Sequence, residues 1–106
     1  GNVKGKTCII TDDIIDSGGT IVNATDALIK RGAKDVYVYV THGVLSGEAI
    51  EKIKKSKIKN LVITDTIDNL DKVKKARNIE VLSISNLLAE AMKRISNSTS
   101  VSDLFK

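Results

Sequence analysis

The sequence predicts an α/β fold in which a parallel β-sheet is flanked by helices. Short apolar runs rich in β-branched residues alternate with stretches of helical periodicity, in the order β-α-β-α-β-loop-β-α. The apolar runs also lack a clean alternation of apolar and polar residues, which is the pattern of strands covered on both faces. Right-handed crossovers would join such strands into one sheet.

Four apolar runs are predicted as strands: Thr7–Thr11, Val36–Thr41, Leu61–Thr64 and Glu80–Ile84. The first strand should be central in the sheet, because its residues 7–10 are apolar throughout and because the loop that follows it carries the clearest chemical information. A central strand needs neighbours on both sides, and both faces of its sheet need helices. The predicted helices cover such a sheet only thinly. We therefore expect further neighbours, supplied by more chain or by another subunit.

Three helices are predicted around these strands. The first covers Thr20–Arg31 and ends at Gly32, a residue typical of helix C-termini. The second begins after an N-cap at Ser46. The third runs over Ser85–Ile95 and carries one apolar stripe. One or two further helical turns are expected around Leu70–Ala76.

Length and composition limit the classes of protein that the chain can belong to. At 106 residues it forms a single domain, residues 1–106, with one modest core. The single cysteine, Cys8, lies in an apolar run and cannot form an internal disulfide, so we expect a core residue in a reducing, cytoplasmic compartment. No apolar stretch approaches the ~18–20 residues of a membrane span, and no signal peptide is present, so no membrane partner is expected.

The net charge is +4, and the basic residues gather in two segments, 52–59 and 72–77. A solvated helix face is the simplest interpretation of both segments. Nucleic-acid binding is disfavoured, because no aromatic residues interleave with the charges and no known binding motif accompanies them. A basic surface would also suit an anionic small-molecule substrate.

The segment Asp12–Thr20 carries the clearest chemical information. It leaves the first apolar run through paired acids and enters the first helix through Ser-Gly-Gly-Thr. Gly18 and Gly19 can adopt backbone angles that let consecutive N–H groups point at one anion. Ser17 and Thr20 add hydroxyl donors, and the positive end of the helix completes the cradle. We therefore predict a phosphate site here, at the edge where open α/β sheets bind ligands.

The acid pair Asp12 and Asp13 requires a different partner, because carboxylates repel a phosphate. The vicinal hydroxyls of a sugar, or a Mg²⁺ ion that bridges to the phosphate, are the natural candidates. The loop is neither a Walker A sequence nor a Gly-x-Gly-x-x-Gly dinucleotide turn. An ordinary strand-to-helix turn would explain residues 16–19 but not two acids next to a buried strand. A phosphorylated sugar is the ligand that these residues favour.

The order of two acids, two apolar residues and Asp-Ser-Gly-Gly-Thr resembles the phosphoribosyl-diphosphate motif of type I phosphoribosyltransferases and PRPP synthetases. Four further stretches resemble the synthetases in particular: Lys4–Thr7, Thr41–Gly47, Leu87–Ala91 and Ser100–Phe105. The resemblance covers nearly the whole chain, in order. It implies a type I phosphoribosyltransferase-like fold and the C-terminal half of a PRPP synthetase, with the N-terminal domain absent.

The implied activity is that of a ribose-phosphate diphosphokinase, which transfers diphosphate from ATP to C1 of ribose 5-phosphate with Mg²⁺, forming PRPP and AMP. By this resemblance, the residues that hold the 5-phosphate are Asp16, Ser17, Gly18, Gly19 and Thr20. Asp12 and Asp13 would contact the ribose hydroxyls or the associated Mg²⁺. Most of the ATP site would lie in the missing N-terminal half. The chain would then hold no catalytic residue and would be inactive, or nearly so, by itself.

Further roles follow only from the resemblance. Ser100, Ser102 and Phe105 match positions of an allosteric phosphate/ADP site between the subunits of hexamers, so a homo-oligomer is implied. A hydrophobic anchor for the chain end explains Phe105 nearly as well. His42, the only histidine, lies where a strand ends. In the family the histidine linked to catalysis lies in the N-terminal half, so we expect His42 to support loop packing.

Three other functions fit the same residues. A phosphoribosyltransferase would use the loop on PRPP itself, although Thr41–Gly47 and Ser100–Phe105 speak against it. A non-catalytic regulatory subunit associated with PRPP synthetase would keep the fold and lose catalytic residues upstream. A pure oligomerisation fragment would have no affinity for the ligand.

Overall fold

The structure is a computed structural model that describes residues 2–97. Strands and helices alternate along the chain, as predicted. Their order and bounds are β1 (Thr7–Ile15), α1 (Gly19–Lys30), β2 (Asp35–Gly43), α2 (Ala49–Lys55), β3 (Asn60–Thr64), α3 (Leu70–Val73), β4 (Ile79–Leu82) and α4 (Ser85–Ser96).

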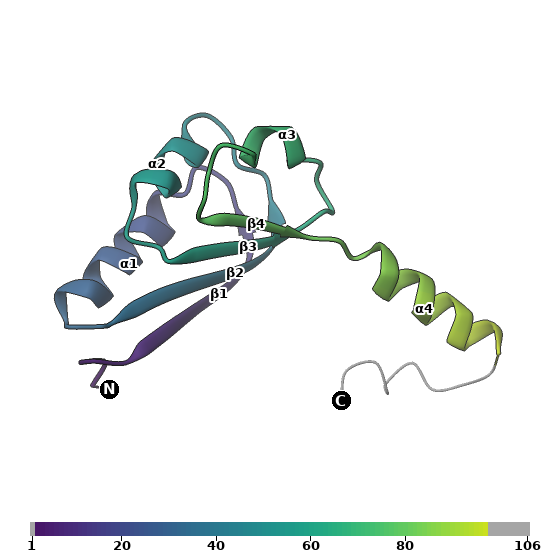
Figure 1. Ribbon diagram of the computed structural model, residues 1–106, viewed down its shortest axis with the longest axis horizontal. Coiled ribbons are helices and arrows are strands. Elements are labelled where there is room, and N and C mark those ends of the chain that lie inside the picture. The colour runs from purple at the N-terminus through teal and green to yellow at the C-terminus, as the bar shows by residue number, and fades with distance from the viewer. Residues whose placement is uncertain (1, 98–106) are drawn as a thin grey trace.

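The strands form one four-stranded sheet in the order β1-β2-β3-β4, with every neighbouring pair parallel (Figure 1). Each strand therefore lies beside the next in sequence, as right-handed crossovers allow. The carboxyl ends of the strands all lie at one edge of the sheet. The prediction of an α/β fold with a parallel sheet flanked by helices is confirmed.

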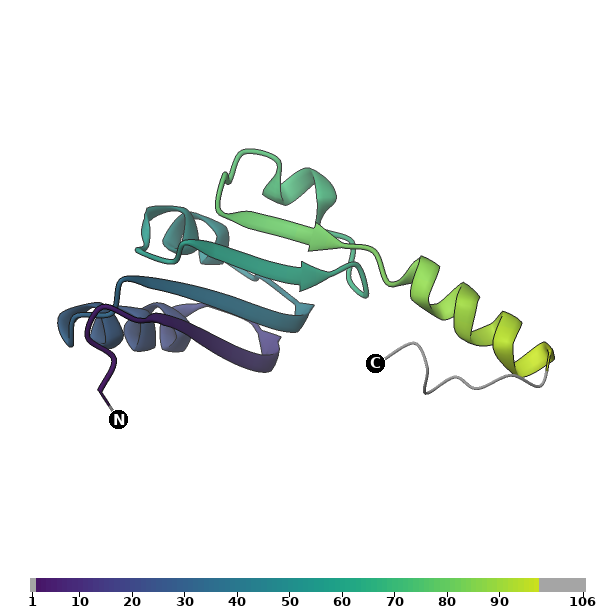
Figure 2. The ribbon, with the colours of Figure 1, turned by 60° about the horizontal axis from the view of Figure 1, so that its bottom comes forward.

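One face of this sheet carries the core. Along β2, Val36, Val38 and Val40 are buried while the intervening tyrosines are not, because successive side chains of a strand point to opposite faces. The buried residues of the helices that join this core are Ile21 in α1, Ala49 and Ile53 in α2, and Val73 in α3. Figure 2 shows the same sheet from a second angle. The described chain is thus a two-layer structure of one sheet and one layer of helices.

The prediction of strands covered on both faces is wrong for the described residues, and so is the central position of the first strand. β1 lies at an edge of the sheet and pairs with β2 alone. Its Ile9 side chain is 61% exposed on the face that no helix covers. The apolar run of β1 therefore indicates a strand suited to burial, but residues 2–97 contain no second layer that buries it.

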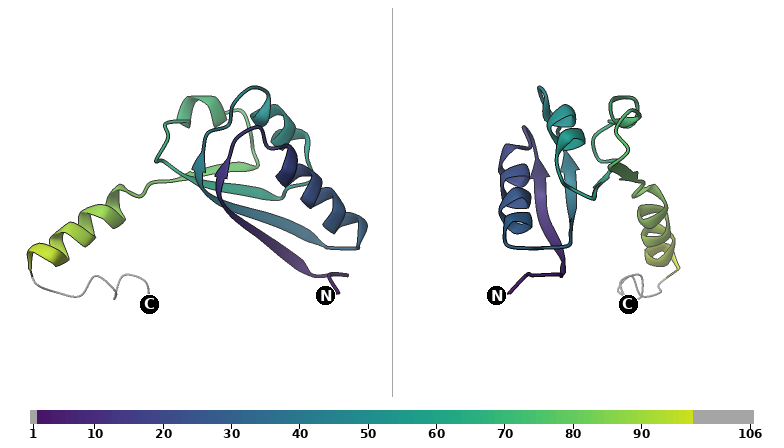
Figure 3. Two further views of the ribbon diagram at one scale, coloured as in Figure 1. Left: turned by 180° about the vertical axis from the view of Figure 1, so that it is seen from behind. Right: turned by 60° about the vertical axis from the view of Figure 1, so that its left-hand side comes forward.

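The last helix, α4, extends away from the sheet (Figures 1 and 3). Its predicted apolar stripe is present, yet none of its residues is buried. The exposed members of the stripe are Leu87, Leu88, Met92 and Ile95. Within residues 2–97, no helix has the length and apolarity needed to cross a membrane.

Two boundaries differ from the predictions and matter for the site. β1 continues to Ile15 because its ladder with β2 extends to Gly43, so the acid pair lies inside the strand rather than after it. The second helix begins at Ala49 and has no side-chain cap, so Ser46 is not its N-cap. The Ser46 hydroxyl is bonded elsewhere, as described below.

Candidate functional site

The turn between β1 and α1 holds the predicted phosphate loop. Gly18 precedes the helix with φ +83°, a left-handed conformation that favours glycine. No side chain caps the start of α1, and no acidic residue lies in its first turn. The first N–H groups of a helix have no partner within the helix, so they remain available to an anion here.

A hollow of about 210 Å³ opens beside this turn. Its lining contains most of the predicted ligand-binding residues together with three isoleucines. The full set is Asp12, Ile14, Ile15, Asp16, Ser17, Gly18, Thr20 and Ile21. Two of the predicted residues, Asp13 and Gly19, are not part of the lining. The structure thus brings most of the predicted phosphate-binding residues and one acid of the pair to a single hollow at the carboxyl end of β1.

The two acids of the pair point to different faces of the sheet. Asp12 is in register with the buried Val40, on the face of the helices, and it lines the hollow. Asp13 follows it in the same strand and therefore faces the open side. The Asp12 carboxylate also accepts a hydrogen bond of 2.8 Å from the Asp13 amide. Only Asp12 is placed to act inside the hollow.

A magnesium ion fits this arrangement, with few of its ligands supplied by side chains of the protein. Within residues 2–97, no group of three or more His, Cys, Asp or Glu side chains is placed to hold a metal ion. Mg²⁺ commonly binds through one or two carboxylates, substrate phosphates and several waters. The exposed carboxylate of Asp12 beside the predicted phosphate cradle matches that donor set.

The segment after β2 runs directly alongside the loop. The amides of Val44 and Leu45 donate hydrogen bonds of 2.9 and 3.2 Å to the Ile15 carbonyl. The Ser46 amide donates one of 3.1 Å to the Asp16 carbonyl. The Ser46 hydroxyl donates a further bond to the Asp16 carboxylate. Sequence reasoning missed this contact, because it interpreted Ser46 only as a helix cap and as part of a family signature.

His42 is half-buried near the end of β2 and does not line the hollow. Its Nδ1 forms a hydrogen bond of 2.8 Å with the Thr66 hydroxyl, in the segment that follows β3. Nearby, the Thr64 hydroxyl donates a bond of 2.6 Å to the Thr41 carbonyl. These contacts join the carboxyl ends of β2 and β3, which agrees with the expected role of His42 in loop packing.

Asp65 lies in the same region, and hydrogen bonds lower the pKa of its carboxyl group. The Ile84 amide donates a 3.0 Å hydrogen bond to its carboxylate, and this bond lowers the pKa of Asp65. A hydrogen bond from the Ser83 side chain lowers that pKa further. These bonds fix the chain between β4 and α4 rather than any ligand-binding group.

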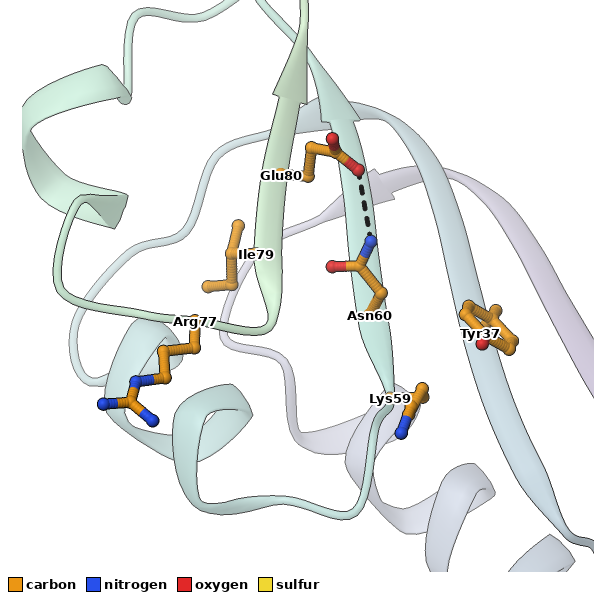
Figure 4. Close-up of a pocket in the computed structure, with 6 residues that line it drawn as sticks. All are labelled: Tyr37, Lys59, Asn60, Arg77, Ile79 and Glu80. Carbon is orange, nitrogen blue, oxygen red and sulfur yellow. Dashed lines mark hydrogen bonds between the residues drawn. The ribbon is translucent and has the colours of Figure 1, made fainter.

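Two larger hollows lie at the opposite edge of the sheet, near the amino ends of β3 and β4. One, of about 520 Å³, is lined by Tyr37, Lys59, Asn60, Arg77, Ile79 and Glu80. Figure 4 shows Asn60 bonded to Glu80, with the Arg77 guanidinium pointing away from that pair. The other, of about 390 Å³, is lined by Lys54, Ser56, Ile58, Lys75, Arg77 and Asn78. The two basic segments of the sequence therefore meet here, on an open surface.

These two hollows are larger than the one beside the glycine turn, but their position in the sheet argues against a functional site. In open α/β sheets, ligands bind at the carboxyl ends of the strands, where the smaller hollow lies. The basic side chains also have a structural explanation, because Lys54 and Lys55 lie in the last turn of α2, where cations complement the helix dipole. The carboxyl edge holds both the glycine turn and the acids, and so it is the candidate site.

A family model described as the phosphoribosyl synthetase-associated domain matches residues 1–106. The chain belongs to this family. The resemblance noted in the sequence is thereby confirmed over the whole chain.

Individual relatives of this family agree. Proteins named ribose-phosphate pyrophosphokinase from Bradyrhizobium diazoefficiens and Clostridium tetani are 59% and 52% identical to the chain over 105 residues, which is 99% of it. The chain spans only 33% and 32% of those two relatives. The curated relatives are thus about three times as long as this member of the phosphoribosyl synthetase-associated family.

A solved structure supports the fold. The phosphoribosylpyrophosphate synthetase of Mycobacterium smegmatis superposes with a TM-score of 0.83 at 42% sequence identity, covering 92% of this chain and 33% of that one. The similarity confirms a synthetase-like α/β fold. The residues expected at an allosteric site, Ser100, Ser102 and Phe105, lie outside the described residues, so that expectation stays a prediction.

Proposed function

We propose that the chain supplies the ribose 5-phosphate site of a ribose-phosphate diphosphokinase and forms the C-terminal part of that enzyme. The complete enzyme would transfer diphosphate from ATP to the C1 hydroxyl of ribose 5-phosphate, giving PRPP and AMP. The observation that carries the proposal is the hollow at the end of β1, which combines an uncapped helix start, hydroxyl donors and an acid. The names of the relatives support the choice of reaction.

Each part of the hollow has a distinct task in this proposal. The 5-phosphate lies over the turn, held by backbone N–H groups and by the hydroxyls of Ser17 and Thr20. Gly18 provides the left-handed turn that directs those N–H groups at one point. The carboxylate of Asp12, which lines the hollow, faces the ribose hydroxyls or the Mg²⁺ ion. Asp13 follows it on the open face of the sheet, so its predicted contact with the ligand has no support from the lining of the hollow. Bound Mg²⁺ would neutralise phosphate charge during the transfer, which proceeds mainly by positioning.

The remaining parts of the proposal concern the complete protein. Most of the ATP site lies in the two-thirds of the relatives' length that this chain does not span. We therefore expect the 106-residue chain to form no AMP from ATP and ribose 5-phosphate by itself. The complete protein would be a cytoplasmic homo-oligomer, regulated by phosphate or ADP through Ser100, Ser102 and Phe105.

Calorimetric titration of the chain with ribose 5-phosphate and Mg²⁺ tests the proposal. An Asp16→Ala, Thr20→Ala double variant removes one carboxylate and one hydroxyl of the hollow and should abolish binding. A Glu51→Ala variant is the control, because Glu51 is an exposed acid of α2 that does not line the hollow. Absence of binding by the folded wild-type chain would overturn the claim that its acceptor site is preformed.

The same titration separates the proposal from its alternatives. A phosphoribosyltransferase would bind PRPP in preference to ribose 5-phosphate, so a competition experiment with both ligands distinguishes the two functions. An oligomerisation fragment would bind neither ligand. Formation of AMP by the chain at the rate of a complete enzyme would contradict the assignment of the ATP site to the rest of the protein.

A further inference from the structure

We propose that Ser46 is a positioning residue of the phosphate loop, acting through Asp16, and that the turn Gly43–Ser46 is the rigid support against which this loop is held. The inference rests on the proposed function, because it assigns a second segment of the chain to the same ribose 5-phosphate site. None of the residues Gly43–Ser46 lines the hollow, whereas Asp16, through which they act, does.

The contacts between the support turn and the loop are continuous. Two successive amides of the turn bond to the Ile15 carbonyl, and the next amide bonds to the Asp16 carbonyl. The Ser46 hydroxyl then donates to Oδ1 of the Asp16 side chain. Backbone and side chain of Asp16 are thus both fixed by Ser46, at the residue where the chain leaves β1 and begins the turn toward α1.

The backbone of the support turn has an unusual conformation at Leu45. Leu45 has φ +51°, although a leucine rarely occupies the left-handed region, and it is the one non-glycine residue with positive φ among those described. Such strain persists only where the surroundings determine it, and it concentrates at functional sites. Burial of the Leu45 side chain, which is 2% exposed, holds the residue in place.

The other side of the support turn is also fixed. A Cβ added to Gly43 would lie 2.7 Å from Cδ1 of the fully buried Ile63, so the backbone here approaches β3 as closely as glycine allows. The buried Asn69 donates its side-chain amide to the Gly43 carbonyl. The turn is therefore held from β3 and from the start of α3, and it can transmit that rigidity to Asp16.

The position of Asp16 explains why such support is useful. Its carboxylate lines the hollow and, when bonded to Ser46, ties the loop to the support turn and is kept from rotating into the place of the phosphate. A donor hydroxyl commits one carboxylate oxygen to a fixed direction. Because Ser46 is not the cap of α2, its hydroxyl serves this contact.

The test compares Ser46→Ala with Ser46→Thr, which keeps a hydroxyl. Ser83→Ala is the control, because Ser83 is also an exposed serine whose side chain bonds to a carboxylate, that of the half-buried Asp65. Calorimetry with ribose 5-phosphate and Mg²⁺ should show affinity about fivefold to tenfold weaker for Ser46→Ala, the effect of one exposed charge-assisted hydrogen bond. The threonine variant should bind within about twofold of wild type, and Ser83→Ala should bind as wild type does.

Amide hydrogen exchange without ligand gives the second readout. Ser46→Ala should exchange faster at residues 16–18 and unchanged in β3, whereas the threonine variant should match wild type. The inference would be overturned if Ser46→Ala bound ribose 5-phosphate and exchanged its amides as wild type does. It would also be overturned if Ser46→Thr bound as weakly as Ser46→Ala. If the folded wild-type chain itself binds no ribose 5-phosphate, the proposal of a preformed acceptor site fails. The exchange comparison then still decides whether Ser46 positions the loop, since unchanged exchange at residues 16–18 refutes it.

Discussion

The two adjacent glycines of the phosphate loop should respond in opposite ways to the same substitution. Gly18 has φ +83°, and a Cβ placed there would lie 3.6 Å from Ile53 Cδ1 and 3.9 Å from Ala49 Cβ. These are ordinary van der Waals distances, so Gly18→Ala creates no clash and its cost comes from the backbone alone. A left-handed alanine costs about 1–2 kcal/mol. We expect Gly18→Ala to lower the free energy of unfolding by about that amount.

Gly19→Ala provides the internal reference. Gly19 does not have a positive φ, and an added Cβ would have no atom within 4 Å. Replacing glycine at such a position stabilises a protein by about 0.4–1 kcal/mol, because the unfolded chain loses conformational freedom. Urea denaturation followed by circular dichroism measures both changes. Equal effects of the two substitutions, or a Gly18→Ala variant as stable as wild type, would refute the backbone geometry on which the phosphate cradle depends.

Two further predictions concern the segments around the site. Gly43→Ala should destabilise the chain by about 1–3 kcal/mol in the same assay, because its Cβ would overlap the buried Ile63, and unaltered stability would show that the contact is not close. Asp65→Asn should flatten the loss of stability on acidification. Bonds from the Ile84 amide and the Ser83 side chain lower the pKa of Asp65 in the folded chain. The ionised Asp65 side chain therefore contributes to the free energy of unfolding above its unfolded pKa of about 3.9. This contribution disappears as the pH falls through the folded pKa. Thermal unfolding at pH values from about 6 to 2 compares the two proteins, and parallel curves would contradict this assignment.

The sequence predicted the local features of the chain well. Alternating apolar runs and helical periodicity located each strand and helix of residues 2–97, with boundary errors of a few residues. The loop 16–20 could be predicted as a phosphate site because the chemistry that such a site needs is contained in consecutive residues. The structure places most of those residues around one hollow.

The sequence could not show features that depend on distant pairing. The contact between Asp16 and Ser46 joins residues 30 apart and follows from the register of β1 with β2, which places Ile15 opposite Gly43. The position of β1 at a sheet edge was also missed. Its apolar side chains are typical of a buried strand. Ile9 is nevertheless exposed, because the described residues place helices on one face of the sheet only.

The location of a bound phosphate tests the central claim most directly. Nuclear magnetic resonance of the ¹⁵N-labelled chain during titration with ribose 5-phosphate and Mg²⁺ compares the two edges of the sheet. If the loop at the carboxyl edge is the acceptor site, the amides of residues 17–20 should shift first and saturate together. Shifts confined to the basic hollow at the opposite edge, around Lys54, Lys75 and Arg77, would contradict the account.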